Sequence, residues 1–285
     1  MKSKRIARVL FFLICSVATA LISSAQTLTT HQLTLIHPDD PDFDTLLSAN
    51  FPGIERLDGY SVVRPYLVLV RNDTAHLPKA YSIEWETKTS EGPTRRTFSD
   101  FIERWNPALA TERKALAQNE LRLISEAFDV SPAEFVAQKN WIATKMSMLL
   151  THPPYTLLNV QSITVSVDAA VFEDGAYTGA DKFQLLLRYQ AMRDAERDMA
   201  EAVLQLLDAK APVSDILAFL DRESEAGLAA NTSTVSRDSY YALYRGREAQ
   251  TFRTLYHRGG IETLMTRAWS VAQHPREKIA RLAPQ

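Results

Sequence analysis

The stretch V-D-A-A-V-F-E-D-G-A-Y-T-G-A-D at residues 167–181 marks the point where the pattern of the chain changes. Asp174-Gly175 is a strong hairpin signal, because glycine accepts the positive φ of a tight turn. Residues 176–178 can return as a short strand, and Gly179 lets the chain change direction. Asp181 is placed to cap a following helix, because its carboxylate can accept from the first free N–H groups. The stretch therefore predicts strands before it and helices after it.

The part before this stretch, residues 26–180, reads as a β-domain. Residues 80–87 alternate apolar Tyr81, Ile83 and Trp85 with polar neighbours, which predicts a half-buried strand. We expect it to pair with a strand at residues 65–70 in an antiparallel sheet. Further candidate strands are residues 29–36, 120–125 and 157–172. Several short antiparallel strands predict an immunoglobulin-like β-sandwich.

The longest candidate strand, residues 157–172, carries an apolar residue at every second position. We expect one face to hold Ile163, Val165, Val167, Ala169 and Val171. Residues 98–114 and 131–150 are ambiguous, but short helices inserted between the strands fit their patterns. The second of these segments begins with Ser131-Pro132-Ala133-Glu134, which spells a capping box with proline at the first helical position.

The part after the stretch, residues 181–285, reads as a helical domain. Apolar residues at spacings of three and four predict a long amphipathic helix over residues 181–207. Further helices are predicted from residue 214, over 237–257 and over 261–272, with Gly259-Gly260 separating the last two. Residues 181–230 carry a net charge of about −4 and residues 231–285 about +5. We expect complementary faces of packed helices. The chain as a whole is thus predicted to be an α+β protein.

The first 25 residues have the three-part layout of a secretory signal peptide. Lys2, Lys4, Arg5 and Arg8 form a basic start, an apolar run follows, and Ser23-Ser24-Ala25 offers small residues for cleavage after Ala25. The expected location is therefore extracytoplasmic, either periplasmic or secreted. Residues 9–25 carry no charge, so an uncleaved N-terminal membrane anchor is the alternative.

Removal of this segment would leave an acidic chain without a thiol. The only cysteine, Cys15, lies inside it, and the remaining chain carries about −6. No disulfide, cysteine-ligated zinc site or cysteine nucleophile is then expected. The acidity predicts no nucleic-acid partner. Since no other apolar run is long enough to span a bilayer, no stable membrane insertion is expected after cleavage.

Two motifs give the chain a resemblance to a known group of proteins. A strand ending in V-F-x-D-G-x-x-x-G-x-D before a long charged helix resembles a group of secreted bacterial proteins of uncharacterised function. V-R-N-D-T followed by A-Y-S-I-E-W is similar to their N-terminal part. The likeness covers residues 60–205. It implies the strand-then-helix layout and no activity, so no catalytic residue is carried over.

The acidic residues around the hairpin allow a metal-binding interpretation. Asp168, Glu173, Asp174 and Asp181 are the candidate ligands, but their spacing does not fit an EF-hand loop. A role in turns and caps is favoured over metal binding. The six histidines show no zinc-binding helix spacing, and we expect them to be structural or on the surface. We therefore expect no metal and no cofactor.

The sequence contains no recognised catalytic string, so no catalytic residue is assigned. A hydrolase with a dispersed acid/base pair, using Asp168, Asp174 or His152, is the alternative. Tyr240, Tyr244, Arg245 and Arg247 form a candidate interaction surface, because tyrosine and arginine are enriched at binding hot spots. The competing interpretation, which we favour, is that the tyrosines pack this helix against the rest of the protein.

These observations predict a non-catalytic binding or interaction protein of the cell envelope. The expected partner is another envelope protein. The alternatives are a secreted hydrolase and an envelope scaffold held by an uncleaved N-terminal helix.

Overall fold

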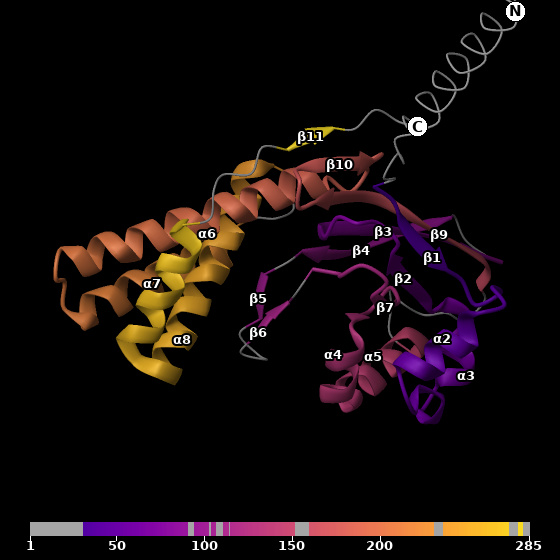
Figure 1. The fold of residues 1–285 in the computed structure, drawn as a ribbon. Helices are drawn as coiled ribbons and strands as arrows, with labels where there is room; N and C mark the ends of the chain where they lie inside the picture. Colours follow the sequence, from indigo (N-terminus) through magenta and orange to yellow (C-terminus); the bar gives the residue numbers. More distant parts are fainter. Residues whose placement is uncertain are drawn as a thin grey trace, which may run out of the picture. The chain divides into compact units, whose positions relative to one another are not determined.

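The structure, a computed structural model, describes residues 31–90, 94–102, 104–106, 111–113, 115–151, 160–230, 236–273 and 279–281 (Figure 1). For residues 104–106, 111–113, 151 and 281 it describes the backbone alone. The predicted signal peptide and His152 lie outside the described residues. The described chain is a mixed α+β protein whose C-terminal part is mostly helical, as the sequence predicts.

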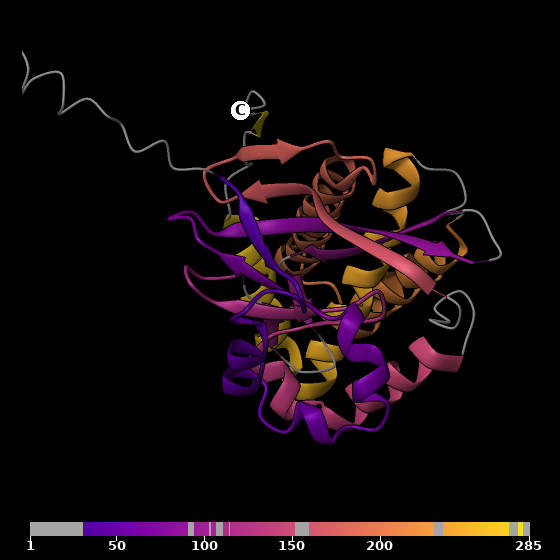
Figure 2. The same cartoon turned by 90° about the vertical axis from the view of Figure 1, so that its right-hand side faces the viewer.

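The first sheet has four antiparallel strands in the order β1-β2-β7-β8. These strands are β1 (Leu33–Ile36), β2 (Val68–Asn72), β7 (Leu121–Ile124) and β8 (Asp129–Val130). On one side it is covered by α2 (Phe43–Asn50), α3 (Tyr60–Val63), α4 (Pro132–Ala137) and α5 (Lys139–Thr151), with short 3₁₀ turns at Ile54–Arg56 and Arg64–Tyr66 (Figure 2). The helices predicted at 131–150 are confirmed, and Ser131 and Glu134 form the expected capping box.

The second sheet has the order β11-β10-β9-β3-β4. Its strands are β3 (Pro78–Thr89), β4 (Arg95–Ile102), β9 (Val160–Phe172), β10 (Ala176–Gly179) and β11 (Ala280–Arg281). All neighbours are antiparallel except β11, which runs parallel to β10. The helix considered for residues 98–114 is wrong for its described part, which forms β4 and the hairpin of β5 (Arg104–Asn106) and β6 (Thr111–Arg113).

The expected pairing of residues 65–70 with residues 80–87 is wrong. β2 pairs with β1 and β7, whereas β3 pairs with β4 and β9. The turn after Asn72 carries the chain from one sheet to the other. Val68 and Val70 therefore pack against Tyr81, Ile83 and Trp85 in one buried core. The two strands face each other across this core and are not joined by backbone hydrogen bonds. The two sheets thus pack face to face, and an immunoglobulin-like topology stays a prediction.

The expected apolar face of β9 is interrupted by a β-bulge at Asp168. Ser82 is paired with Ala169 and Ile83 with Val167, so Asp168 is the extra residue. Before the bulge, odd-numbered residues face the core between the sheets. After it, Ala170 and Phe172 take over that core, and Ala169 and Val171 turn toward the helices. The prediction that one face runs from Ile163 to Val171 is therefore wrong beyond Val167.

The expectation that β3 is only half-buried is also wrong. Ser82 and Glu84, on the face opposite Tyr81 and Ile83, are buried as well. The long helix α6 (Leu185–Asp208) packs over this face, where Ala80 contacts the same core as Leu185 and Tyr189. Glu84 pairs there with Lys182 Nζ at 2.5 Å.

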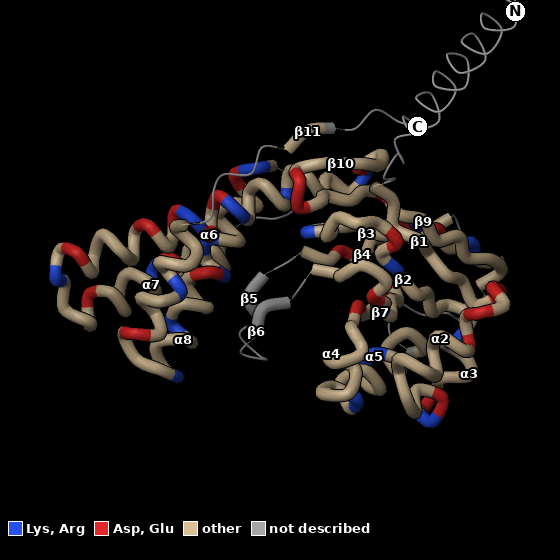
Figure 3. The backbone as a smooth tube through the Cα atoms, in the orientation of Figure 1, with Lys and Arg blue, Asp and Glu red and all other residues tan. Residues whose placement is uncertain are grey.

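The C-terminal part consists of α6, α7 (Val213–Ala229) and α8 (Arg237–Gln273). The predicted break near Gly259-Gly260 is confirmed, because Gly260 has a non-helical φ of 70°. The predicted charge complementarity is confirmed too (Figure 3). Arg237, Arg245 and Arg253 of α8 pair with Asp194, Glu223 and Asp221 of α6 and α7 at 2.5, 2.6 and 2.8 Å.

No helix in the described part of the chain combines the length and the apolar character needed to cross a bilayer.

Candidate functional site

A cleft of about 520 Å³ lies between the β-rich part and the helical part. One wall comes from β4, β8, the loop before β8, α4 and α5, and the other comes from α6 and α8. The lining combines aromatic rings with carboxylates. The carboxylates are Asp100, Glu126, Asp129, Glu134, Glu196 and Glu248. A volume of this size lies within the range of about 300–1,000 Å³ typical of small-molecule sites.

The aromatic side chains of the cleft are Phe98, Phe128, Trp141 and Tyr244, and Phe128 is buried in the protein core. Phe98 stacks on Phe183 with the ring centroids 4.8 Å apart, which fixes its orientation. Trp141 is 42% exposed, a large exposed fraction for a tryptophan. Tyr244 is buried, and burial raises the pKa of its hydroxyl. The cleft thus offers one accessible indole and three rings held in place by packing.

The carboxylates on the β-rich wall are held by arginines. Arg188 binds Asp100 at 2.9 Å, and Arg95 binds Glu126 at 2.8 Å. Arg122 is buried between Asp129 and Glu134 and lies 4.8 Å from the ring of Phe101. Burial lowers the pKa of Arg122, but the charges of its acidic partners outweigh this and raise it overall. This wall is therefore a network of fixed ion pairs with little net charge.

The helical wall holds two buried glutamates on adjacent helices. Glu196 of α6 pairs with Arg193 at 3.0 Å, and Glu248 of α8 lies 3.5 Å from Arg267. Glu248 is only 6% exposed. Burial, followed by the negative charge of Glu196, raises the pKa of Glu248 to about 7, although Arg267 lowers it. Such a pKa allows Glu248 to exchange a proton near neutral pH.

The four residues of the predicted Tyr/Arg surface do not form one continuous surface. Tyr244 and the partly buried Tyr240 pack with α6 and the second sheet, with their ring centroids 6.4 Å apart. Arg245 points to α7 and binds Glu223. Arg247 is exposed, and together with Tyr244 it lines the cleft. Two of the four residues therefore belong to the cleft, and the other two hold the helices together.

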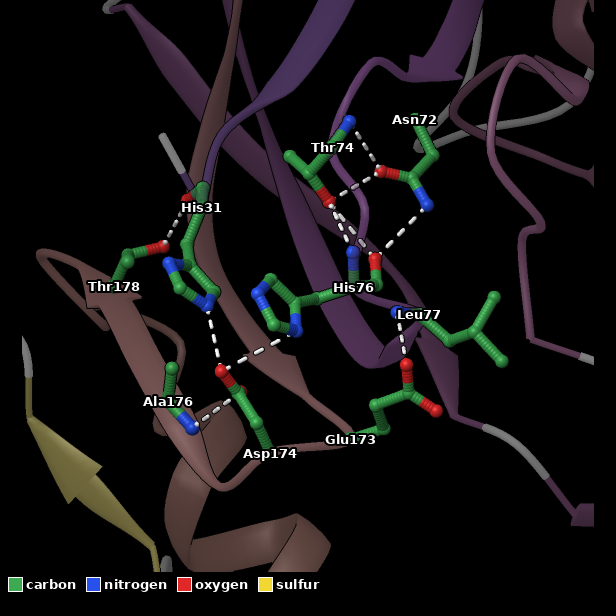
Figure 4. Close-up of polar contacts among 9 residues, drawn as sticks. All are labelled: His31, Asn72, Thr74, His76, Leu77, Glu173, Asp174, Ala176 and Thr178. Atoms are coloured by element: carbon green, nitrogen blue, oxygen red, sulfur yellow. Dashed lines mark hydrogen bonds and ion pairs between the residues drawn. The ribbon is translucent and has the colours of Figure 1, made fainter. Parts of the chain in front are cut away.

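A second group of polar side chains forms at the β9–β10 hairpin (Figure 4). His31 Nε2 and His76 Nδ1 lie 2.8 and 3.4 Å from Asp174 Oδ2. The two imidazole rings stack with their centroids 4.5 Å apart. Burial raises the pKa of Asp174, but the hydrogen bond from Ala176 N–H and the two histidines lower it overall.

The other acidic residues weighed as metal ligands have structural roles. The Asp168 carboxylate accepts hydrogen bonds from Lys182 N, Phe183 N and Ser82 Oγ. The prediction that Asp181 is the N-cap of the long helix is wrong, because α6 begins four residues later than predicted, at Leu185, and Gln184 takes the N-cap position. The Asp181 carboxylate still accepts a hydrogen bond from Leu185 N–H, from a turn before the helix. Glu173 accepts from Leu77 N. Within the described ranges, the one group of three candidate ligands is His31, His76 and Asp174.

Sequence reasoning missed both the cleft and the pairing of the histidines. His31 precedes β1 and His76 lies between β2 and β3, 45 positions apart, so no spacing rule connects them. The cleft acids are spread over residues 100–248 and carry no motif. The sequence feature that could have indicated the histidine site is the pair of motifs V-R-N-D-T and V-F-E-D-G. Residues of both motifs lie around the two histidines.

Comparisons with protein-family models, curated proteins and solved structures found no match to this chain. The resemblance noted on the two motifs therefore stays a prediction.

Proposed function

We propose that this is an exported bacterial protein of the cell envelope that binds a ligand without transforming it. The cleft between the β-rich and helical parts is the binding surface. The observation that carries this proposal is the cleft itself, which joins an exposed indole to a wall of fixed carboxylates. A concave site with aromatic side chains and a few oriented polar groups is the usual form of a ligand pocket.

The chemistry of the walls indicates the class of ligand. Ionised carboxylates accept hydrogen bonds and donate none, so the ligand has to supply the donors. Arginines already neutralise Asp100, Glu126 and Asp129, so charge attraction alone is not the basis of recognition. Cell-wall fragments offer sugar hydroxyls and peptide ammonium groups together. We therefore infer that a soluble glycan–peptide fragment of the envelope is the ligand.

Isothermal titration calorimetry with soluble cell-wall fragments tests this proposal. Trp141→Ala should weaken binding about tenfold or more, because a central aromatic contact is lost. Trp269→Ala is the matched control, since Trp269 is 50% exposed on α8 and does not line the cleft. Equal effects of the two substitutions, or no binding by the unsubstituted protein, would contradict the proposal.

Export is tested separately from binding. N-terminal sequencing of the protein recovered from its native cell should begin at Gln26. A chain that retains Met1 and stays with the membrane would support the anchored scaffold instead. The binding test with the cleft variants then remains valid for the anchored form.

A hydrolase is the second candidate, and one observation favours it. Glu248 has a pKa raised to about 7 and lines the cleft beside Glu196. A carboxyl that keeps its proton near neutral pH can serve as the general acid of a hydrolase. Turnover of cell-wall fragments that is lost in Glu248→Gln would establish this function. Binding without turnover would reject it in favour of the binding protein.

We also propose that the two-sheet part has an immunoglobulin-like topology and that the chain is related to the secreted bacterial proteins it resembles. Support for the first comes from two antiparallel sheets that share one core. Support for the second comes from the sequence motifs alone. A solved structure of one member of that group with the same strand order would test both.

A further inference from the structure

We propose that His31, His76 and Asp174 form a binding site for a divalent transition-metal ion, with Zn²⁺ as the best-suited ion. The site is separate from the cleft and does not rest on the proposed ligand, because none of the three residues lines the cleft. It uses two imidazole nitrogens and one carboxylate oxygen that come from three distant parts of the sequence (Figure 4).

The distances between the donor atoms fit one small ion. Ligand atoms about 2.0–2.2 Å from a tetrahedral Zn²⁺ lie about 3.3 Å from one another. Asp174 Oδ2 lies 2.8 Å from His31 Nε2 and 3.4 Å from His76 Nδ1. One ligand atom from each of the three residues can be chosen so that all lie within 4.8 Å of one another. Small side-chain rotations therefore bring all three onto an ion.

The chemistry of the donors selects the class of ion. Imidazole suits Zn²⁺ and its neighbours in the first transition row, whereas Ca²⁺ and Mg²⁺ prefer oxygen ligands. Two histidines and one carboxylate are a known ligand set of zinc sites that keep a fourth position for water. The side chains of His31, His76 and Asp174 are 11%, 30% and 34% exposed, so an ion and a water molecule can reach them.

The residues next to each ligand hold it in place, as the outer shell of a metal site does. Thr74 Oγ1 accepts from His76 N–H, and Asn72 Nδ2 donates to the His76 carbonyl. Ala176 N–H binds the second oxygen of Asp174 at 3.0 Å, which leaves Oδ2 for the histidines. The edge of Phe172 packs on the His31 ring at 5.0 Å.

The backbone of the two turns is also joined beside the ligands. Leu77 N–H donates to Glu173 Oε1 at 3.1 Å, and Glu173 N–H donates to the Leu77 carbonyl at 2.8 Å. Leu77 follows His76, and Glu173 precedes Asp174. These two hydrogen bonds therefore join the loop that carries His76 to the hairpin that carries Asp174. The two sequence motifs thus meet at this site, and a bound ion would connect the start of β1 to both turns.

Zinc binding is measured on protein purified without a polyhistidine tag, using calorimetry and metal analysis after dialysis. We expect one equivalent of Zn²⁺ per chain that Mg²⁺ and Ca²⁺ do not displace. His31→Ala, His76→Ala and Asp174→Asn should each weaken binding about tenfold or more. His257→Ala is the matched control, because His257 is exposed on α8. Absence of binding, or ligand variants that bind as tightly as the unsubstituted protein, would overturn the proposal.

A second measurement needs no variant and covers the case in which a substitution prevents folding. Diethyl pyrocarbonate modifies accessible histidines, and peptide mass spectrometry locates the modification. Zn²⁺ should protect His31 and His76 and leave His257 unprotected. Equal modification of all three with and without Zn²⁺ would show that the group is only a hydrogen-bonded contact between turns.

Discussion

Asp168 shows how much one residue contributes to this fold. It is the extra residue of the β9 bulge, and its carboxylate receives the N–H groups of Lys182 and Phe183 and the hydroxyl of Ser82. Its carbonyl accepts from Ala180 and Asp181. The same residue thus reverses the faces of β9 and fixes the start of the helical part.

The first prediction concerns this carboxylate. Asp168→Ala should lower the free energy of unfolding by roughly 2–4 kcal/mol, because the buried Ser82 hydroxyl and two partly buried backbone N–H groups lose their acceptor. Urea denaturation followed by circular dichroism measures the effect. Asp39→Ala, at an exposed position in the loop before α2, should change stability little. An equally small effect at Asp168 would contradict the role given to it.

The second prediction concerns the pH dependence that Glu248 introduces. Its pKa is raised from 4.5 to about 7 in the folded protein, so the folded state holds a proton that the unfolded state releases. The stabilisation is complete below about pH 4.5 and is lost as the pH rises through 7. A change in pKa from 4.5 to about 7 corresponds to a full loss on the order of 3 kcal/mol.

The melting temperature against pH tests this prediction. The unsubstituted protein should lose stability between pH 5 and pH 8 relative to Glu248→Gln, which cannot ionise. Parallel curves for the two proteins over this range would show that Glu248 does not hold its proton in the folded state.

At the scale of elements, helices α7 and α8 approach one another through two glycines. A Cβ atom added at Gly246 would lie 2.5 Å from the Cα atom of Gly227, which is too close for any real contact. The absence of side chains at this point allows the helices to pack closely. Arg245, next to Gly246, can then reach Glu223 at 2.6 Å.

The third prediction follows from this close approach. Gly246→Ala should lower stability by about 1–3 kcal/mol, because the helices have to separate. Helix propensity alone would act in the opposite direction, by about 1 kcal/mol. The sign of the change, measured by thermal unfolding, therefore decides between close packing and propensity. A more stable variant would contradict the observed helix contact.

The elements themselves were largely predictable, because their signals are local. The capping box at Ser131, the turn at Gly175 and the break at Gly260 each depend on neighbouring residues, and all three are confirmed. The partners of β2 and β3 were not predictable, since two facing strands and two paired strands have the same apolar pattern. The bulge at Asp168 was also not predictable, because it depends on the register between β3 and β9 and does not change the composition of the strand.

At the scale of the whole molecule, function depends on contacts between distant parts of the sequence. Trp141 and Glu248 share a cleft although they lie 107 positions apart. His31 meets Asp174 over 143 positions. Composition and motif spacing could therefore predict the layout of strands and helices, but they could not predict either site.

If the cleft binds the glycan–peptide ligand, the indole N–H signal of Trp141 should report the binding. The four tryptophans give four indole signals in a ¹H–¹⁵N spectrum, which single substitutions to phenylalanine assign. On titration with soluble cell-wall fragments, we predict that the Trp141 signal shifts in a saturable way while those of the buried Trp85 and of Trp269 stay in place. A saturable shift at Trp269 with none at Trp141, or no shift at any indole, would show that the cleft is not the binding surface.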